Sequence, residues 1–336
     1  MIEVDGGYGE GGGQIVRIAA ALSLCTQQPV RIRNIRAKRE VGGLRPQHLS
    51  SLKILTELSE TKITGLRMGS REVEIIPGKI TGGKKKINIG TAGSIALLLQ
   101  TVLLPSLLGN EGIELTIIGG TDVARAPTID YLMNVLFPML RKIGGNAEIW
   151  VERRGFYPAG GGIVHLSIQP SKISHWICTE PHGSLEICGK IVCSGLPEHV
   201  VKRMKHAALN VLLEYHPKID SEYVQASCPG VSITLWGKYE NTVLGASNIG
   251  EKGVPAEEVG DICADELKRN LSGECTVDSH MCDQLLPFLA FSDGESRFVT
   301  RYVSLHAETV AWVLRQFTNR EIEFVSGKEN VVVKVR

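Results

Sequence analysis

One order of elements recurs along this chain and constrains its fold more than any other feature. Residues 45–60 carry leucines at helical spacing, and two short strand-like segments, 62–66 and 72–76, follow on either side of a turn. The same order returns in residues 130–168 and once more in 307–335. A helix that covers one face of a small sheet is a stable two-layer arrangement. The repeat therefore predicts a two-layer α/β protein, of the α+β type, whose large domain contains three strand–loop–helix–strand–turn–strand units.

Residues 183–273 interrupt the repeat inside its third copy. They carry their own strand and helix patterns, so we expect a smaller inserted α/β domain there and a catalytic domain made of residues 1–182 and 274–336. The pattern leaves one alternative open, which is that this segment packs into the main sheet. Its expected elements are a strand at 185–192, a helix at 197–215, strand-like segments within 221–236 and a helix at 255–271.

Composition limits the partners that this chain can have. Its formal net charge is +1, so a nucleic acid would have to be bound by a local basic patch and not by overall charge. No apolar stretch is long enough to cross a bilayer, and the first residues lack the pattern of a signal peptide. We therefore expect a cytoplasmic protein with no membrane partner.

Eight cysteines are spread along the chain. None stands in a CxxC pair, and their spacing fits no zinc module. Free buried thiols are the expected state in the cytosol, and a disulfide within the cysteine-rich segment 178–263 stays open.

The most glycine-rich loop lies near the start of the chain, at 5–14, and an apolar helix pattern follows it. Glycines before a helix let backbone N–H groups approach an anion closely, and a helix N-terminus favours negative charge. The loop lacks the Gly-Lys-Ser/Thr ending of a Walker P-loop, so it predicts a phosphate site of another kind. Glu10 lies among the glycines and is the candidate ligand for a divalent cation. A purely structural turn is the alternative.

The densest basic segment, 31–48, follows this helix pattern. Guanidinium groups bind phosphate through paired hydrogen bonds, and phosphate contacts dominate the affinity of proteins for nucleic acids. One interpretation is therefore a phosphate or nucleic-acid site, and the other is a solvated charged surface.

Further loops place polar groups beside expected helices. Residues 90–94 precede an apolar helix that carries Gln100, a polar amide that needs a partner. Residues 119–127 and 153–162 mix glycine with arginine; each could bind a polyanion, and ordinary turns are the simpler interpretation.

Two late segments place reactive groups at expected helix starts. Asp283 and Gln284 stand at the start of a helix pattern, where an aspartate is often only a cap. His306 follows a strand expected at 298–303 and begins another helix pattern. An imidazole at such a turn can act as an exposed nucleophile or general base, and a structural histidine is the alternative.

Taken in order, these loops resemble RNA 3′-terminal phosphate cyclases over nearly the whole chain. The resemblance implies a large domain of three repeated α/β units with a smaller α/β domain inserted in the last unit, which agrees with the pattern above. The matching motifs are Asp5-Gly6, Gly9-Glu10-Gly11-Gly12-Gly13-Gln14, Gly43-Leu44-Arg45-Pro46-Gln47-His48-Leu49, Arg154-Gly155, Tyr157-Pro158, Gly160-Gly161-Gly162 and Asp283-Gln284-Leu285.

The resemblance implies a ligase of RNA processing that uses ATP to convert an RNA 3′-terminal phosphate into a 2′,3′-cyclic phosphate. His306 would attack the α-phosphate of ATP and release pyrophosphate, and the histidine–AMP adduct would pass AMP to the RNA 3′-phosphate. The neighbouring 2′-hydroxyl would then displace AMP, helped by its proximity to the phosphorus. The expected ligands are ATP, Mg²⁺ or Mn²⁺ and an RNA with a 3′-phosphate end, and homodimerisation stays open.

The resemblance also implies roles for individual side chains. His306 is the expected nucleophile and Glu10 the expected metal ligand. The expected ATP contacts are Gln14, Gln100, His280, Met281, Cys282, Asp283 and Gln284. The expected phosphate or RNA contacts are Arg17, Arg36, Arg39, Arg45, Gln47 and His48.

Departures from the family pattern leave the detailed shape of the adenine pocket open. Thr309 is followed by Val310 where the family often has Thr-Asn, and His280 stands where an aromatic residue is sometimes found. Two alternative functions also remain: a non-catalytic relative that assists ribosome assembly, and an enolpyruvyl transferase-like enzyme. The first would lack the nucleophilic histidine, and the second would form no protein–AMP bond.

Overall fold

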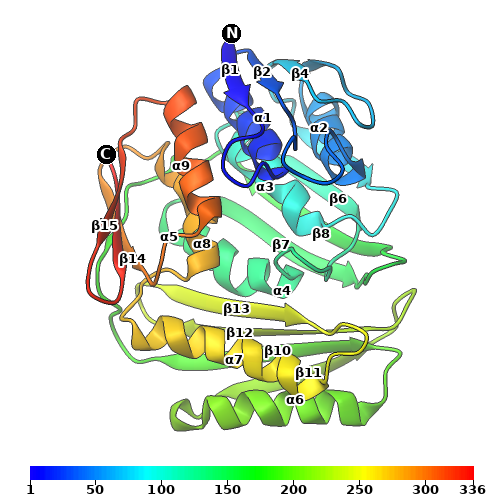
Figure 1. Ribbon diagram of the computed structural model, residues 1–336, viewed down its shortest axis with the longest axis vertical. Helices are drawn as coiled ribbons and strands as arrows, with labels where there is room; N and C mark the ends of the chain where they lie inside the picture. Colours follow the sequence, from blue (N-terminus) through cyan, green and yellow to red (C-terminus); the bar gives the residue numbers. More distant parts are fainter.

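Three four-stranded sheets share one strand order in the computed structural model, which describes residues 1–336 (Figure 1). In each sheet the first two strands are parallel, and the other two pair antiparallel, in the order first–second–fourth–third. The fold predicted from the repeat is therefore confirmed. The strands are β1 (Ile2–Asp5), β2 (Val30–Arg33), β3 (Lys62–Thr64) and β4 (Val73–Ile76); β5 (Gly83–Asn88), β6 (Ile113–Gly119), β7 (Asn146–Arg153) and β8 (Gly162–Gln169); and β9 (Ile177–Cys178), β14 (Ser296–Thr300), β15 (Ile322–Ser326) and β16 (Val331–Val335).

Each unit is longer than the sequence pattern predicted, because a further strand and helix precede it. The extra helices, one per unit, are buried, and the one in the second unit is apolar on nearly every side. The sequence predicts a helix after the loop 5–14 and another after 90–94, but it did not assign them to the repeat. Helix α3 has no polar face and therefore shows no amphipathic periodicity. The helices are α1 (Gln14–Thr26) and α2 (Pro46–Leu58); α3 (Ile95–Leu107), α4 (Ile129–Tyr131), the π-helical turn η1 (Leu132–Leu136) and α5 (Phe137–Lys142); and α8 (Ser279–Leu289) and α9 (Leu305–Phe317).

The first helices of the three units meet in the middle of the large domain. Helix α1 packs against both α3 and α9, and α8 packs against α9 and α3 (Figure 1). The three sheets lie around these helices, and one hydrophobic core of 64 buried residues joins them. The N-termini of α1, α3 and α9 are thereby brought into one region, although they lie far apart in the sequence.

A fourth sheet lies between β9 and α8 in the chain and forms the lower part of the molecule in Figure 1. Helices α6 and α7 pack side by side on one of its faces, and the other face meets α4. It has a separate core of 20 buried residues, so it packs beside the large domain and adds no strand to the other sheets. The limits 183–273 for an inserted domain stay a prediction. Its elements are β10 (Glu186–Ser194), α6 (Glu198–Val211), the 3₁₀ turn η2 (Leu213–Tyr215), β11 (Lys218–Val224), β12 (Gly230–Lys238), β13 (Val243–Ile249) and α7 (Ala256–Ser272).

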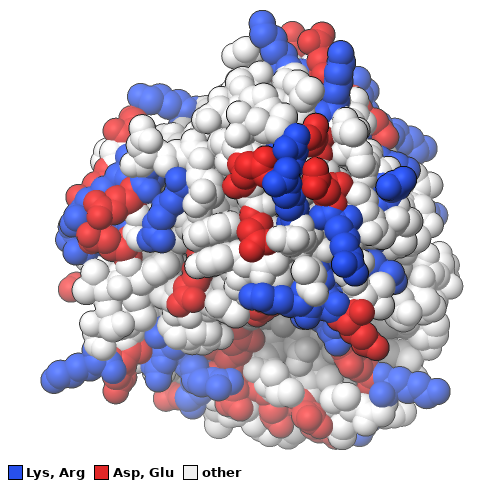
Figure 2. Space-filling view, turned by 45° about the horizontal axis from the view of Figure 1, so that its top comes forward, with Lys and Arg blue, Asp and Glu red and all other residues white.

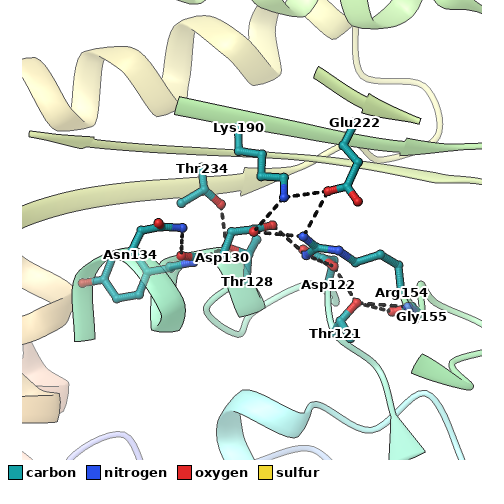
Figure 3. A network of polar contacts seen from close by, with 11 residues as sticks. Thr121, Asp122, Thr128, Asp130, Asn134, Arg154, Gly155, Lys190, Glu222 and Thr234 are labelled. Atoms are coloured by element: carbon teal, nitrogen blue, oxygen red, sulfur yellow. Dashed lines mark hydrogen bonds and ion pairs between the residues drawn. The ribbon is translucent and has the colours of Figure 1, made fainter. Parts of the chain in front are cut away.

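A buried polar network joins this sheet to the second unit (Figure 3). The Arg154 guanidinium donates two hydrogen bonds to the Asp130 carboxylate, at 2.7 and 2.9 Å. It also lies 3.7 Å from Asp122 and 3.5 Å from Glu222 of β11. Lys190 of β10 contacts Glu222 at 2.6 Å, which completes the link between the two parts. Charges buried this deeply are tolerated only when they are paired, so this network favours one relative position of the two sheets.

The helix expected at 130–143 is present but is not one regular α-helix. Its middle turn is π-helical, and the Phe137 N–H donates to the Leu132 carbonyl five residues earlier. Pro138 follows directly and has no N–H to continue the α-helical hydrogen bonds. The helix pattern in the sequence therefore predicted the element correctly but not its local widening.

All eight cysteines are free thiols, five of them buried. No helix combines the length and the apolar character that crossing a membrane requires.

Candidate active site

The glycine-rich loop 5–14 lies against the start of α9, and its glycines are required by close contacts. Gly9 has a φ of +56°, and a Cβ added there would lie 2.6 Å from Thr309 Oγ1. A Cβ on Gly13 would lie only 1.8 Å from His48 Nε2, so the imidazole occupies the space that a side chain would need. The loop therefore brings backbone close to α9 and to His48 of α2 in a way that only glycine permits.

His306 is the second residue of α9, whose start is capped by Ser304, the Oγ of which accepts a hydrogen bond from the Ala307 N–H. The imidazole Nε2 lies 3.4 Å from Glu10 Oε2, and the side chain is half exposed. Burial lowers the pKa of His306 below its usual value, although the Glu10 carboxylate acts in the opposite direction. A lowered pKa keeps the imidazole neutral at neutral pH, which is the form that a nucleophile needs.

Two cations from the basic segment hold the glycine loop from the outside. Arg39 Nη2 lies 3.0 Å from Glu10 Oε2, and Lys38 Nζ donates to the Gly9 carbonyl at 3.0 Å. Because Arg39 and His306 contact the same carboxylate oxygen, Glu10 links the basic segment to α9.

A second cluster of polar groups lies deeper, between α1, α3 and α8. Gln14 Nε2 donates to Asp283 Oδ2 at 3.2 Å and to the His306 carbonyl at 3.3 Å. Arg17 Nε donates to Gln100 Oε1 at 3.1 Å, which supplies the partner that this amide needs. Burial raises the pKa of Asp283 to about 7 and lowers the pKa of Arg17 to about 10. Perturbed groups of this kind concentrate at functional sites.

The prediction that Asp283 and Gln284 open a helix is wrong. Helix α8 begins at Ser279, and Asp278 caps it by accepting hydrogen bonds from the N–H groups of His280 and Met281. The cap therefore stands five residues earlier than Asp283. Asp283 lies in the second turn of α8, so helix capping does not explain the position of its carboxyl group.

The expected ATP contacts on α8 separate into two groups. The side chains of Met281 and Cys282 are fully buried in the hydrophobic core. His280 faces outward and its Nε2 lies 2.9 Å from Glu266 on α7, and this hydrogen bond raises the pKa of His280 to about 9. His280 is therefore an imidazolium at neutral pH, held by a side chain that lies within the segment 183–273.

A cavity of about 430 Å³ brings seven of the fifteen predicted site residues together. Its walls come from α1, α3, α8 and α9 of the large domain and from the end of β13. A volume of this size is typical of a small-molecule site. The predicted residues that line it are Gln14, Arg17, Gln100, His280, Asp283, Gln284 and His306.

Comparison with known proteins identifies the family of this chain. A family model described as RNA 3′-terminal phosphate cyclase matches residues 8–324. A protein of that name from Archaeoglobus fulgidus is 40% identical over 336 residues, covering 99% of this chain and 100% of the relative. Proteins of the same name from Pyrococcus furiosus and Methanopyrus kandleri are both 42% identical, and each alignment covers at least 96% of both chains. This chain belongs to the RNA 3′-terminal phosphate cyclase family. The predictions of the family and of an enzyme are confirmed.

Five of the six side chains predicted to contact phosphate or RNA do not line this cavity, and one of the five, Arg39, contacts Glu10 instead. Arg36 donates to the carbonyls of Val41 and Gly43 and closes its own loop. His48 is buried below the glycine loop, and burial lowers its pKa to about 3, so it carries no charge for a phosphate. Gln47 pairs with the backbone of Ser94 through both amide atoms, at 2.8 and 3.0 Å. Arg45 is exposed beside the start of α2.

Sequence reasoning missed several residues that line the cavity. Arg125 belongs to the loop 119–127, for which the sequence leaves polyanion binding and an ordinary turn open, and its backbone has a φ of +61°. A non-glycine residue in this region is uncommon, and such strain concentrates at functional sites. Ser247, Asn248 and Glu251 reach the cavity from the end of β13 and the loop after it. No motif marks them, because their position depends on how the fourth sheet meets the large domain.

The donor set fits a divalent cation only if the substrate supplies most of the ligands. Nowhere in residues 1–336 do three or more His, Cys, Asp or Glu side chains form a group that could hold a metal ion. Glu10 offers one carboxylate beside His306, and its Oε2 contacts two cationic or ionisable partners. Mg²⁺ bound to nucleotides typically takes one or two protein carboxylates and completes its shell with phosphate oxygens and water. Glu10 fits that arrangement.

Proposed function

We propose that this cyclase converts an RNA 3′-terminal phosphate into a 2′,3′-cyclic phosphate with ATP, through a His306–AMP intermediate, and releases pyrophosphate and AMP. One observation carries the proposal: His306, with a lowered pKa and half exposed, lines the same cavity as Gln100, Asp283 and Gln284. Within the family, this is the arrangement that an exposed nucleophile beside a bound nucleotide requires.

In the first step a neutral imidazole nitrogen of His306 attacks the α-phosphorus of ATP. The N–P bond forms, the bond from the α-phosphorus to the bridging oxygen breaks, and its electron pair leaves with pyrophosphate. Nε2 is the nitrogen that faces Glu10, so it is the proposed nucleophile. The phosphates would lie against the glycine loop, where backbone N–H groups and the N-terminus of α1 favour negative charge.

In the second and third steps the adduct supplies a leaving group that the RNA lacks. An oxygen of the RNA 3′-phosphate attacks the phosphorus of His306–AMP, and the N–P electron pair returns to the imidazole. The RNA 2′-hydroxyl then attacks the activated 3′-phosphorus, losing its proton, and AMP leaves. Its oxygen is already beside the phosphorus, so the last step gains from intramolecular geometry.

Positive charge around the nucleophile would stabilise the phosphates as they react. Arg17 is buried beside the cavity and, with a pKa of about 10, is a cation at neutral pH. Arg39 lies against Glu10 at the loop. A divalent cation held by Glu10, when bound, would neutralise charge on the departing pyrophosphate. Such electrostatic stabilisation is commonly the largest contribution to this kind of catalysis.

Labelled ATP tests the proposal directly. The purified chain is incubated with ATP labelled at the α-phosphate and Mg²⁺ without RNA, and the label on the protein is followed; ATP labelled at the γ-phosphate is the negative control. We expect acid-labile, base-stable label in wild type and none in His306→Ala. His199→Ala, which removes an exposed histidine on α6, is the matched variant and should be labelled fully. Undiminished labelling of His306→Ala would contradict the proposal, as would the absence of label from wild type.

The same assay separates the two alternative functions. A non-catalytic relative would take up no AMP, and an enolpyruvyl transferase-like enzyme would act on a small phosphorylated substrate without a covalent nucleotide. Incubation of labelled protein with an RNA that ends in a 3′-phosphate should transfer the label and produce a 2′,3′-cyclic end.

A further inference from the structure

A second and larger cavity, of about 1240 Å³, opens between the large domain and the fourth sheet. We call it the interdomain groove. Its large-domain wall includes Ser94, Asp122 and Phe156, and its other wall includes Met204, Val231 and Val259. The surface is hollowed where the two parts of the molecule meet (Figure 2). Nothing in the proposed ATP chemistry occupies this space.

The interdomain groove adjoins the cavity of about 430 Å³ that contains His306, which we call the nucleotide cavity. Five residues line both of them, three from the large domain and two from the end of β13 and the loop after it: Leu97, Ala124, Arg125, Ile249 and Glu251. His306 lines only the smaller cavity. A second substrate that lies in the interdomain groove would therefore reach His306 through this junction, from a different side than the nucleotide.

Arg125 is the one cation among these five shared residues. Its side chain is exposed and forms no ion pair or hydrogen bond within residues 1–336, so the charge is free for a ligand. Its backbone is left-handed, at a φ of +61°, which costs a non-glycine residue on the order of 1 kcal/mol. A free arginine held at that cost, where two cavities join, is placed to bind an anion that spans them.

The remaining groove surface suits a single nucleic-acid strand better than a small molecule. Tyr157 is 74% exposed at its rim, which leaves a ring free to stack on a base. Lys252 is exposed without an ion-pair partner, whereas Arg203 on the same side is paired with Glu257 at 3.2 Å. Aromatic platforms beside scattered cations are the usual means of holding single-stranded RNA.

We propose that the interdomain groove holds the last nucleotides of the RNA, and that Arg125 binds the terminal 3′-phosphate at the junction with the nucleotide cavity. This proposal rests on the proposed function, since it assigns the path of the second substrate. The strand lies between the two parts of the molecule, its bases beside Tyr157 and its 3′-phosphate directed toward His306. The fourth sheet then forms half of the substrate site, and the Arg154 network fixes the width of the groove.

Binding of short fluorescent RNAs tests the proposal without any requirement for catalysis. Two RNAs of one sequence, ending in a 3′-phosphate or a 3′-hydroxyl, are titrated by anisotropy at fixed salt. We expect wild type to prefer the 3′-phosphate, and Arg125→Gln to lose that preference, about 10- to 100-fold in affinity for a charge-assisted contact. Arg67→Gln, an exposed arginine in the loop between β3 and β4, is the matched control and should keep the preference.

Stacking is tested by a second pair of variants. Tyr157→Ala should weaken both RNAs by a similar factor, about 10-fold, because stacking does not read the terminal group. Tyr223→Ala removes a tyrosine that is 54% exposed on β11 outside the groove, and it should bind as wild type does. A 4-thiouridine next to the 3′ end should crosslink wild type to peptides that line the groove. This last measurement needs no variant and so does not depend on how a variant folds.

Transfer of AMP distinguishes failure of this inference from failure of the proposed function. Preformed, labelled protein–AMP is freed of ATP and mixed with the 3′-phosphate RNA in a single turnover, and Arg125→Gln should slow transfer by about 10- to 100-fold. A preference for 3′-phosphate that survives in Arg125→Gln, or crosslinks confined to peptides outside the groove, would overturn the groove assignment. A third outcome separates the two proposals: wild type crosslinks to groove peptides, Arg125→Gln loses the preference for 3′-phosphate, and wild type takes up no AMP. That outcome would support the groove assignment and overturn the His306 chemistry.

Discussion

Arg154 and Arg125 stand in similar loops and have opposite surroundings. Both loops mix glycine with arginine, and both follow a strand of the second unit. Arg154 is 5% exposed and lies among the carboxylates of Asp122, Asp130 and Glu222 (Figure 3). Arg125 is exposed and has no carboxylate partner. The difference teaches that the first arginine holds the two parts of the molecule together and the second is left available between them.

The largest expected effect is on the stability of the Arg154 network. Arg154→Met removes the only guanidinium among three carboxylates, and leaving buried charges unpaired typically costs about 3–5 kcal/mol. Urea unfolding of wild type, Arg154→Met and the exposed control Arg67→Met measures it. A loss below about 1 kcal/mol, the usual value for surface pairs, would break the contrast between the two arginines.

A smaller effect is expected where the glycine loop meets His48. Gly13→Ala forces a Cβ into the imidazole, and overpacking typically costs about 1–3 kcal/mol; it should also slow labelling with AMP. Gly12→Ala is the neighbouring control, since its nearest contact would be the Arg39 guanidinium at 3.5 Å and its stability should change by less than about 0.5 kcal/mol. Equal effects of the two substitutions would show that the imidazole does not fill the space beside Gly13.

The next effect concerns Asp283, whose carboxyl has no guanidinium partner of the kind that Arg154 gives Asp130. Its pKa of about 7 lies above the ordinary value, so the folded chain binds this proton more tightly than the unfolded chain. Stability should therefore fall as pH rises from about 4 to 7, since one pKa unit corresponds to about 1.4 kcal/mol. Asp283→Asn should be more stable than wild type at pH 8, by about 1 kcal/mol or more, and the gain should shrink near pH 5. Thermal unfolding across this range checks it, and a variant less stable than wild type at pH 8 would contradict the inferred burial cost.

A feature could be predicted from the sequence where the residue and the groups that it contacts lie close together in the chain. The Gly13 turn, the cavity residue Gln100 and the nucleophile candidate His306 are marked by local patterns. The Asp278 cap was missed because the motif drew attention to Asp283, deeper in the same helix. The sequence did not distinguish the surroundings of Arg154 from those of Arg125. Glu222 and Lys190 of the network around Arg154 lie in the fourth sheet, and no spacing in the sequence predicts where that sheet packs.

The smallest expected effect is a gain in stability at Arg125. Arg125→Gly relieves a left-handed backbone and removes no ion pair, so it should stabilise the fold by about 0.5–1 kcal/mol while losing the preference for 3′-phosphate RNA. Differential scanning calorimetry measures the gain. A destabilised variant would mean that the side chain supports the fold, as Arg154 does, and the contrast would disappear.

The most direct test of the central claim is to locate the AMP and follow its use. Protein treated with ATP and Mg²⁺ is digested at mildly alkaline pH, where a phosphoramidate survives, and the modified peptide is sequenced by mass spectrometry. We predict AMP on His306, and its loss from that peptide when RNA with a 3′-phosphate, but not a 3′-hydroxyl, is added before digestion. AMP on a lysine, or a His306 adduct that the 3′-phosphate RNA does not consume, would contradict His306 as the nucleophile of the cyclisation.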